Sequence, residues 1–241
     1  MSDIKETKII TPLIDKYLLL RQTPDKDIYV MLHSKDKRVG GFHPSSLSKC
    51  AREIYYGYKG YERDRVPTAV NEKCFDVGHV VEGCYGRYFE EMDEMEKKTP
   101  GLFNGFKLIG SNIKGENKEL EIFYEYDKIV EINKMQYLLD IKTTKDGEYG
   151  WGSMPHPHYI LQVQIYMFLT GVHNGVLIYQ NKNTQIQAEY HFKYLPELFD
   201  KVKNKIKYIK NCVKNKTVPK REGERSSQGC RWCNYQYTCW K

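Results

Sequence analysis

Residues 119–144, ELEIFYEYDKIVEINKMQYLLDIKTT, decide the fold. Two segments rich in aromatic and β-branched residues, 119–131 and 135–144, lie on either side of Asn133-Lys134. Such segments are typical of β-strands, and the Asn-Lys pair between them is typical of a tight turn. The sequence therefore predicts an antiparallel hairpin here.

The turn predicts the register of this hairpin. If the residues that flank Asn133-Lys134 pair with each other, Asp127 lies opposite Asp140 and Glu125 lies opposite Lys142. Successive side chains of a strand point to opposite faces, so residues two apart share a face. All four charged side chains are therefore expected on one face.

Two aspartates placed opposite each other repel, which destabilises a hairpin unless something offsets the repulsion. A divalent cation such as Mg²⁺ would offset it, since it prefers carboxylate oxygens. A lysine on the same face could orient or help deprotonate a water, which suits metal-dependent hydrolysis of a phosphodiester. An ordinary solvent-exposed face with surface charges explains the same spacing, so the hairpin alone leaves both interpretations open.

The rest of the chain alternates helical and strand-like segments, which indicates an α/β fold. A turn at 43–46 is expected to precede a helix, with Ser45 or Ser46 as its N-cap and with Cys50 and Arg52 within it. Further helices are expected at residues 10–21, 70–95, 159–170 and 195–215, strands at 174–180 and 185–193, a loop at 59–69, a break at 99–101 and a turn-like tail at 217–241.

Length and composition indicate one ordinary globular domain of 241 residues with 40% hydrophobic residues. The 38 Lys and Arg exceed the 31 Asp and Glu, a mild basic excess that is compatible with a phosphate-rich partner. No apolar stretch reaches the roughly 18 residues that a membrane span requires. The first residues lack the features of a secretory signal. We therefore expect a cytoplasmic protein without a membrane segment.

Two pairs of polar residues share helix faces. His79 and Glu82 are three residues apart, and His79 could bind a metal through a neutral ring nitrogen, although a lone histidine is more often an ordinary surface residue. Gln162 and Tyr166 are four residues apart on an otherwise apolar helix. A buried amide needs hydrogen-bond partners, so Gln162 either satisfies neighbouring backbone or faces a polar cleft.

The spacing of Cys230, Cys233 and Cys239, C-x2-C-x5-C, is the most specific local pattern in the chain. Three thiolates need a fourth ligand to complete a tetrahedral zinc site or a cubane cluster, and the spacing does not decide between zinc and iron–sulfur. The candidates for the fourth ligand are Cys50, Cys74, Cys84 and Cys212. If it is Cys50, the site ties the early helix to the C-terminal tail and adds to folding stability.

Taken together, these motifs resemble the RecB-like branch of the PD-(D/E)XK nucleases, and within it the iron–sulfur exonucleases of CRISPR-associated and phage-encoded type. The resemblance runs from residue 50 to residue 239. The matching motifs, in order, are Cys50-Ala51-Arg52, His79 in GHVVEG, Asp127 in YEYDKIV, Asp140-Ile141-Lys142, Gln162 to Tyr166, and the cysteine triplet. Asp140 departs from the Glu that many members of the branch carry, which puts the fine geometry at the metal in doubt.

The resemblance implies an α/β nuclease core with a central mixed sheet flanked by helices, and a cysteine-ligated cluster that joins the N- and C-terminal parts. The single domain 1–241 would comprise a helical part at 1–60, the nuclease core at 61–216 and a cluster-binding tail at 217–241. A 4Fe–4S cluster would lie on Cys50, Cys230, Cys233 and Cys239, and the other three cysteines would be free thiols.

The resemblance also implies the site and the activity. Mn²⁺ or Mg²⁺ would be bound by His79, Asp127, Asp140 and the Ile141 carbonyl. Lys142 would position the attacking water, and Gln162 and Tyr166 would support the lysine or contact DNA. The expected activity is that of a DNA exonuclease that acts mainly on single strands, with endonuclease activity as a possible side activity. A homo-oligomer or other DNA-processing proteins are compatible partners.

Two alternatives remain open at this stage. One is a non-catalytic nucleic-acid-binding scaffold that keeps the fold and the cluster, and the other is a zinc-stapled domain with unrelated chemistry. A lysine-rich helix, with Lys201, Lys203, Lys205, Lys207 and Lys210, could guide DNA, although a solvated helix face explains it as well.

Overall fold

The computed structural model describes residues 40–147 and 151–241, which form a five-stranded mixed sheet with helices on both faces. The strands follow chain order across the sheet, and β3 and β4 form the parallel pair among antiparallel neighbours. The strands are β1 (Lys107–Asn117), β2 (Ile122–Ile132), β3 (Met135–Thr144), β4 (Asn174–Asn181) and β5 (Gln187–Lys193). The α/β class and the mixed sheet are therefore as the sequence predicted.

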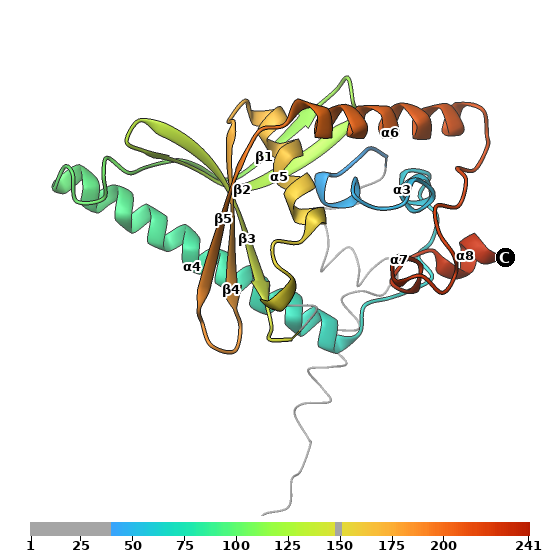
Figure 1. The fold of residues 1–241 in the computed structure, drawn as a ribbon, viewed down its shortest axis with the longest axis horizontal. Coiled ribbons are helices and arrows are strands. Elements are labelled where there is room, and N and C mark those ends of the chain that lie inside the picture. The colour runs from blue at the N-terminus through green and yellow to red at the C-terminus, as the bar shows by residue number, and fades with distance from the viewer. Residues whose placement is uncertain (1–39, 148–150) are drawn as a thin grey trace, which may run out of the picture.

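The helices form layers around this sheet (Figure 1). They are η1 (Pro44–Ser46), α3 (Ala51–Tyr58), α4 (Ala69–Lys98), η2 (Trp151–Ser153), α5 (Pro157–Thr170), α6 (Pro196–Lys214), α7 (Gln228–Arg231) and α8 (Gln236–Trp240). Helix α4 packs on one face, where Tyr85 meets Val130 and Ile141. Helix α5 packs on the other, where Val163 meets Leu138. Helices α6 and α3 form a further layer beyond α5.

The central hairpin has the predicted turn and register. Asn133 and Lys134 both have positive φ, 50° and 63°, which matches the right-handed twist of the flanking strands. The backbone pairs run from Ile132 with Met135 to Lys128 with Leu139 and end there. Beyond this point β2 stays paired with β1, and β3 stays paired with β4, so the sheet forks.

The fork corrects one prediction. Glu125 does not lie opposite Lys142: it is paired with Lys114 of β1, with their charged groups 3.6 Å apart. Lys142 instead forms an ion pair with Asp140. The physical reason is that each strand keeps its ladder with its outer neighbour, so the hairpin register cannot be extended past the fork.

The early helix and the tail differ from the sequence prediction at their ends. Helix α3 begins at Ala51 with Cys50 at the N-cap, so neither Ser45 nor Ser46 caps it. The backbone N–H of Ala51, which has no partner within the helix, instead donates to the Glu222 carboxylate of the tail at 2.7 Å. The tail, predicted to be turn-like, contains the short helices α7 and α8. The helix predicted at 10–21 lies outside the described residues.

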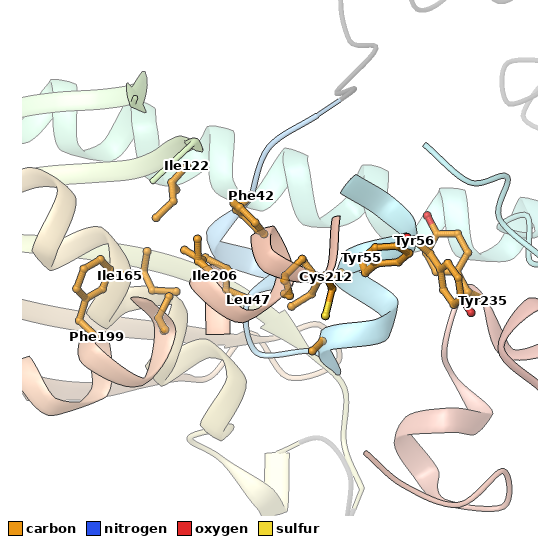
Figure 2. Packing of buried hydrophobic residues seen from close by; sticks show 14 residues of the cluster. Phe42, Leu47, Tyr55, Tyr56, Ile122, Ile165, Phe199, Ile206, Cys212 and Tyr235 are labelled. Carbon is orange, nitrogen blue, oxygen red and sulfur yellow. The ribbon is translucent and has the colours of Figure 1, made fainter. Parts of the chain in front are cut away.

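The N-terminal and C-terminal parts share one hydrophobic cluster. Figure 2 shows its side chains in a row that links α6, α3 and the tail. Along this row lie Phe199, Ile165, Ile206, Leu47, Cys212, Tyr55, Tyr56 and Tyr235. The two ends of the described chain are therefore packed together by apolar side chains. In the described part of the chain, no helix is both long and apolar enough to cross a bilayer.

Candidate active site at the fork of the sheet

The predicted aspartates lie together where the sheet forks. Asp140 on β3 is fully buried, and Asp127 lies on β2 next to the last backbone pair of the hairpin. Asp127 Oδ2 accepts a hydrogen bond from the backbone N–H of Ile141 at 2.8 Å. The Asp127 carboxylate therefore accepts a hydrogen bond from a β3 amide just beyond the point where the backbone pairing of β2 with β3 ends.

Lys142 completes this charged group. Its ammonium lies 2.7 Å from Asp140 Oδ2, and its side chain is 18% exposed. Apart from this ammonium, the buried Asp140 Oδ2 has no polar partner among the described residues. The ammonium also lies 5.0 Å from the centre of the Tyr159 ring, within cation–π distance.

Burial and mutual repulsion perturb the pKa values of the group. Burial, followed by the charge of Asp140, raises the pKa of Asp127 to about 7. Burial also raises the pKa of Asp140, against the lowering effect of Lys142. Burial alone would lower the pKa of Lys142, but Asp140 and Asp127 outweigh it and raise that pKa above its ordinary value. The site thus holds a firmly protonated lysine beside two carboxylates that are costly to ionise.

Gln162 of α5 contacts Asp140 rather than Lys142, and Tyr166 contacts Gln162. Gln162 Nε2 donates to Asp140 Oδ1 at 3.2 Å and to the Tyr166 hydroxyl at 3.1 Å. Both side chains are buried, and burial raises the pKa of Tyr166, so its hydroxyl stays protonated. Any support that they give to Lys142 therefore passes through Asp140.

A cavity of about 980 Å³ opens beside this group. His79 of α4, Asp127, Gln162 and Tyr166 all line it, so four predicted site residues from three elements meet at one cavity. Asp140 and Lys142 lie against these residues through the contacts given above. The spacing in the sequence predicted each pair, but not the cavity between them.

Sequence reasoning gave little or no weight to several residues at this cavity. Lys128 is 1% exposed, and its ammonium donates to Asn112 Oδ1, while Asn112 Nδ2 donates to Glu82 at 2.7 Å. Glu82 also contributes to the raised pKa values of both aspartates. Gly86, one turn beyond Glu82, faces this lysine, and a Cβ there would be in ordinary van der Waals contact with Lys128 Cε at 3.6 Å. No local pattern in the sequence indicated that Lys128 would be buried.

The donor set suits a hard divalent cation. Two buried carboxylates with raised pKa values carry more negative charge, when both are ionised, than Lys142 neutralises, and Asp140 Oδ2 has that lysine alone as its polar partner among the described residues. In residues 40–147 and 151–241, however, no three His, Cys, Asp or Glu side chains are gathered closely enough to form a ready-made metal site. The carboxylates thus fit a metal that completes its shell with water or substrate, as Mg²⁺ does.

The four predicted cluster cysteines lie on two segments that touch each other. Cys50 caps α3, and the other three lie in the tail that packs against α3. Arg52 joins the segments, because it donates to the Pro219 carbonyl at 2.6 Å and contacts Cys239 Sγ at 3.7 Å. Burial raises the pKa of Cys50 and raises that of Cys233 to about 12. All seven cysteines of the chain are free thiols, and the cluster stays a prediction.

The lysine-rich helix α6 uses several of its lysines within the chain. Lys203 forms an ion pair with Asp200, Lys210 forms one with Glu121, and Lys205 donates to the Lys49 carbonyl at 2.9 Å. Three of the five lysines thus have contacts within the chain, and the DNA-guiding role of this face stays a prediction.

No protein-family model and no curated protein sequence matches this chain. Among solved structures, SSO0001 is similar with a TM-score of 0.48 and 18% identity, over 95% of each chain. An alkaline exonuclease from Laribacter hongkongensis has a TM-score of 0.48 and 14% identity, over 74% of this chain and 90% of that one. A phage-related exonuclease from Haemophilus somnus 129PT has a TM-score of 0.43 and 17% identity, over 73% and 96%. At these values a shared activity does not follow from similarity, and function has to be inferred from the site.

Proposed function

We propose that the protein is a divalent-metal-dependent deoxyribonuclease of the PD-(D/E)XK type, acting as an exonuclease on single-stranded DNA. The observation that carries this proposal is the convergence of Asp127, Asp140 and Lys142 at the fork of the sheet. They form a buried, under-neutralised acidic pair with a protonated lysine, beside a cavity large enough for a nucleotide. Strongly perturbed ionisable groups beside a cavity are a common mark of a catalytic site.

Asp127, Asp140 and the Ile141 carbonyl would hold Mg²⁺ or Mn²⁺, with His79 as a further ligand from α4. When bound, the cation supplies Lewis acidity toward the phosphate and makes a water more acidic. The single lysine that faces the two buried carboxylates supports this assignment, as does the raised pKa of Asp127, which burial and the charge of Asp140 cause. His79 of α4 lines the same cavity as Asp127, which supports its place in the set.

Lys142 would act as a cation throughout, since its pKa is raised. It can donate hydrogen bonds to the attacking water or to a non-bridging phosphate oxygen, and so orient the water for attack. Gln162 holds Asp140 from the other side through its 3.2 Å hydrogen bond. Tyr166 accepts from the same amide, and its own proton can be donated to a ligand in the cavity.

We further propose that Cys50, Cys230, Cys233 and Cys239 bind a 4Fe–4S cluster. The contacts of Arg52 and Ala51 with the tail support this, because they hold the segment of Cys50 against the segment of the other three. Four thiols suit either an iron–sulfur cluster or zinc. The group would have a structural role, because its ligands lie on the two ends of the described chain that pack against each other.

The proposed activity is tested by degradation of end-labelled single- and double-stranded DNA with Mn²⁺, with Mg²⁺ and with EDTA. We expect metal-dependent loss of the single strand from one end. Asp140→Asn removes the charge but keeps the volume, so it should lower the rate by at least about 100-fold, as loss of a positioned catalytic group does.

The matched control is Asp200→Asn, which removes an exposed aspartate on α6 and should cleave as the wild type does. Unchanged cleavage by Asp140→Asn would show that the site is wrongly assigned. No cleavage by the wild type in any condition would instead favour a binding or scaffold role.

A further inference from the structure

A second cavity, of about 610 Å³, lies at the end of strand β3. Its lining includes Thr143, His156, His158, Tyr159, Tyr179 and Trp232, and we call it the aromatic groove. The proposed mechanism uses none of these side chains except for the ring of Tyr159 beneath Lys142. The volume lies within the range of about 300–1,000 Å³ that small-molecule sites occupy.

One wall of the groove consists of rings that are held in place. The rings of His156 and His158 stack with centroids 5.6 Å apart and planes 13° apart. The Tyr159 ring lies 4.0 Å from that of His158. The backbone N–H of His156 donates to the hydroxyl of the fully buried Tyr179 at 3.1 Å. The rings are thus anchored to strand β4, although His158 itself is exposed.

The other wall comes from the tail. Trp232, between Cys230 and Cys233, lines the groove and is 76% exposed. A single exposed aromatic residue needs no explanation by itself. This one borders a cavity that also has three ordered rings, contributed by a segment more than 70 positions earlier in the sequence. The fold therefore brings aromatic surfaces from two distant segments to one groove.

The groove adjoins the proposed active site. Thr144, two residues beyond Lys142 and on the same face of β3, lines the groove, and so does Tyr159, whose ring centre lies 5.0 Å from the Lys142 ammonium. A strand with a phosphate at Lys142 would therefore have its neighbouring nucleotide at the mouth of the groove.

We propose that the aromatic groove binds an unpaired nucleobase of the DNA strand that is held at Asp140 and Lys142. This rests on the proposed function. Every base has a flat face that stacks on aromatic side chains, so such a site takes any sequence. A paired base cannot enter, because its faces are already stacked within the duplex and it must be unstacked to reach a pocket. The groove would thus be the source of single-strand preference.

The test uses a single strand with one 2-aminopurine, a base whose fluorescence falls when it stacks on a ring. Binding is measured in EDTA, which withholds the metal that cleavage needs, with the same strand annealed to its complement as the comparison. We expect wild-type protein to quench the single strand. Trp232→Leu should lose most of the quenching and raise Kd for the single strand by at least about fivefold, as loss of one stacking ring does. Trp232→Phe should retain both.

Two further variants keep the result interpretable. Tyr237→Leu removes another exposed ring of the tail, outside the groove, and should behave as the wild type does. His158→Leu tests the opposite wall and should weaken binding even if the tail does not tolerate Trp232→Leu. Wild-type quenching and affinity in both Trp232→Leu and His158→Leu, or no single-strand binding by the wild type, would overturn the proposal. Quenching without metal-dependent cleavage would leave the groove in place and reject the nuclease. Metal-dependent cleavage by the wild type, together with wild-type quenching and affinity in the groove variants, would support the nuclease and reject the groove.

Discussion

Asp127, a proposed metal ligand, also makes the stability of the folded protein depend on pH. Its carboxylate accepts a hydrogen bond from the backbone N–H of Ile141 on β3. Burial and the charge of Asp140 nevertheless raise its pKa to about 7. The unfolded chain would ionise the same group near its ordinary value of 3.8. The folded protein without metal therefore binds a proton that the unfolded chain has released over this range.

This difference predicts a pH dependence with a definite sign. In EDTA, the free energy of unfolding should fall as the pH rises from about 4 to about 7, by an amount of the order of a few kcal/mol. Asp127→Asn should flatten this slope and raise Tm above that of the wild type at pH 8, while Asp200→Asn should not. Thermal melting across this range makes the test. A wild-type Tm that rises steadily toward pH 8 in EDTA would contradict the proposed burial of charge.

Lys128 gives the second prediction at this scale, because stability and function should change in opposite directions. Its ammonium is buried, with the neutral Asn112 as its hydrogen-bond partner, and replacing a buried charge by an apolar group of similar size is often neutral or stabilising. Lys128→Met should therefore keep or raise Tm. It should also weaken DNA binding, because this lysine lines the larger cavity. Lys107→Met, at an exposed ion pair, is the control for loss of charge, and equal DNA affinity in the two variants would count against the prediction.

At the scale of single elements, helix α3 depends on a contact from the far end of the chain. The Glu222 carboxylate accepts the N–H of Ala51 in the first turn, where a carboxylate also interacts favourably with the helix dipole. Local sequence cannot show this, because Ser45 and Ser46 have the right chemistry for a cap and the residue that acts is 171 positions away. This is why the predicted N-cap was wrong although the helix was right.

Glu222→Ala should lower the stability of the folded chain by about 1 kcal/mol, the usual cost of losing an N-terminal cap. Glu222→Gln should recover part of this, since the amide oxygen still accepts the hydrogen bond. Chemical denaturation of the three proteins measures the difference. A loss no larger than that of Glu224→Ala, at a neighbouring tail glutamate, would show that the contact contributes nothing.

What could be predicted from sequence depended on how local each feature is. The turn at Asn133-Lys134, the pairing of the hairpin and the shared face of Gln162 and Tyr166 follow from spacing within one or two elements, and they were predicted. The fork of the sheet, the burial of Lys128 and the aromatic groove depend on how β1, α4 and the tail meet the hairpin. Such contacts between distant segments have no periodicity to read, so they could not be predicted.

At the scale of the whole molecule, the packed N- and C-terminal parts make a clear prediction for the cysteines. If one metal or cluster joins Cys50 to the tail, Cys233→Ala should remove it and lower Tm, because bound metal adds to folding stability. Metal analysis and visible absorbance identify the group, with iron and sulfide expected and zinc as the alternative. Cys74→Ala, at an exposed thiol on α4, is the matched control. Equal metal content in the two variants would exclude the tail site.

The fork also has a mechanical meaning. Strands β1 and β2 form one half of the sheet, and strands β3, β4 and β5 form the other. Five backbone pairs between β2 and β3 join the two halves, and the two aspartates lie just beyond the last of these pairs. A small rotation of β1 and β2 relative to the other three strands would change the distance between Asp127 and Asp140 much more than the distance between any two residues within one half. Ligand affinity at this site should therefore respond to strain applied far away, for example by a cross-link between the tips of β1 and α4. The distance between the two aspartates thus depends on the angle between the two halves of the sheet.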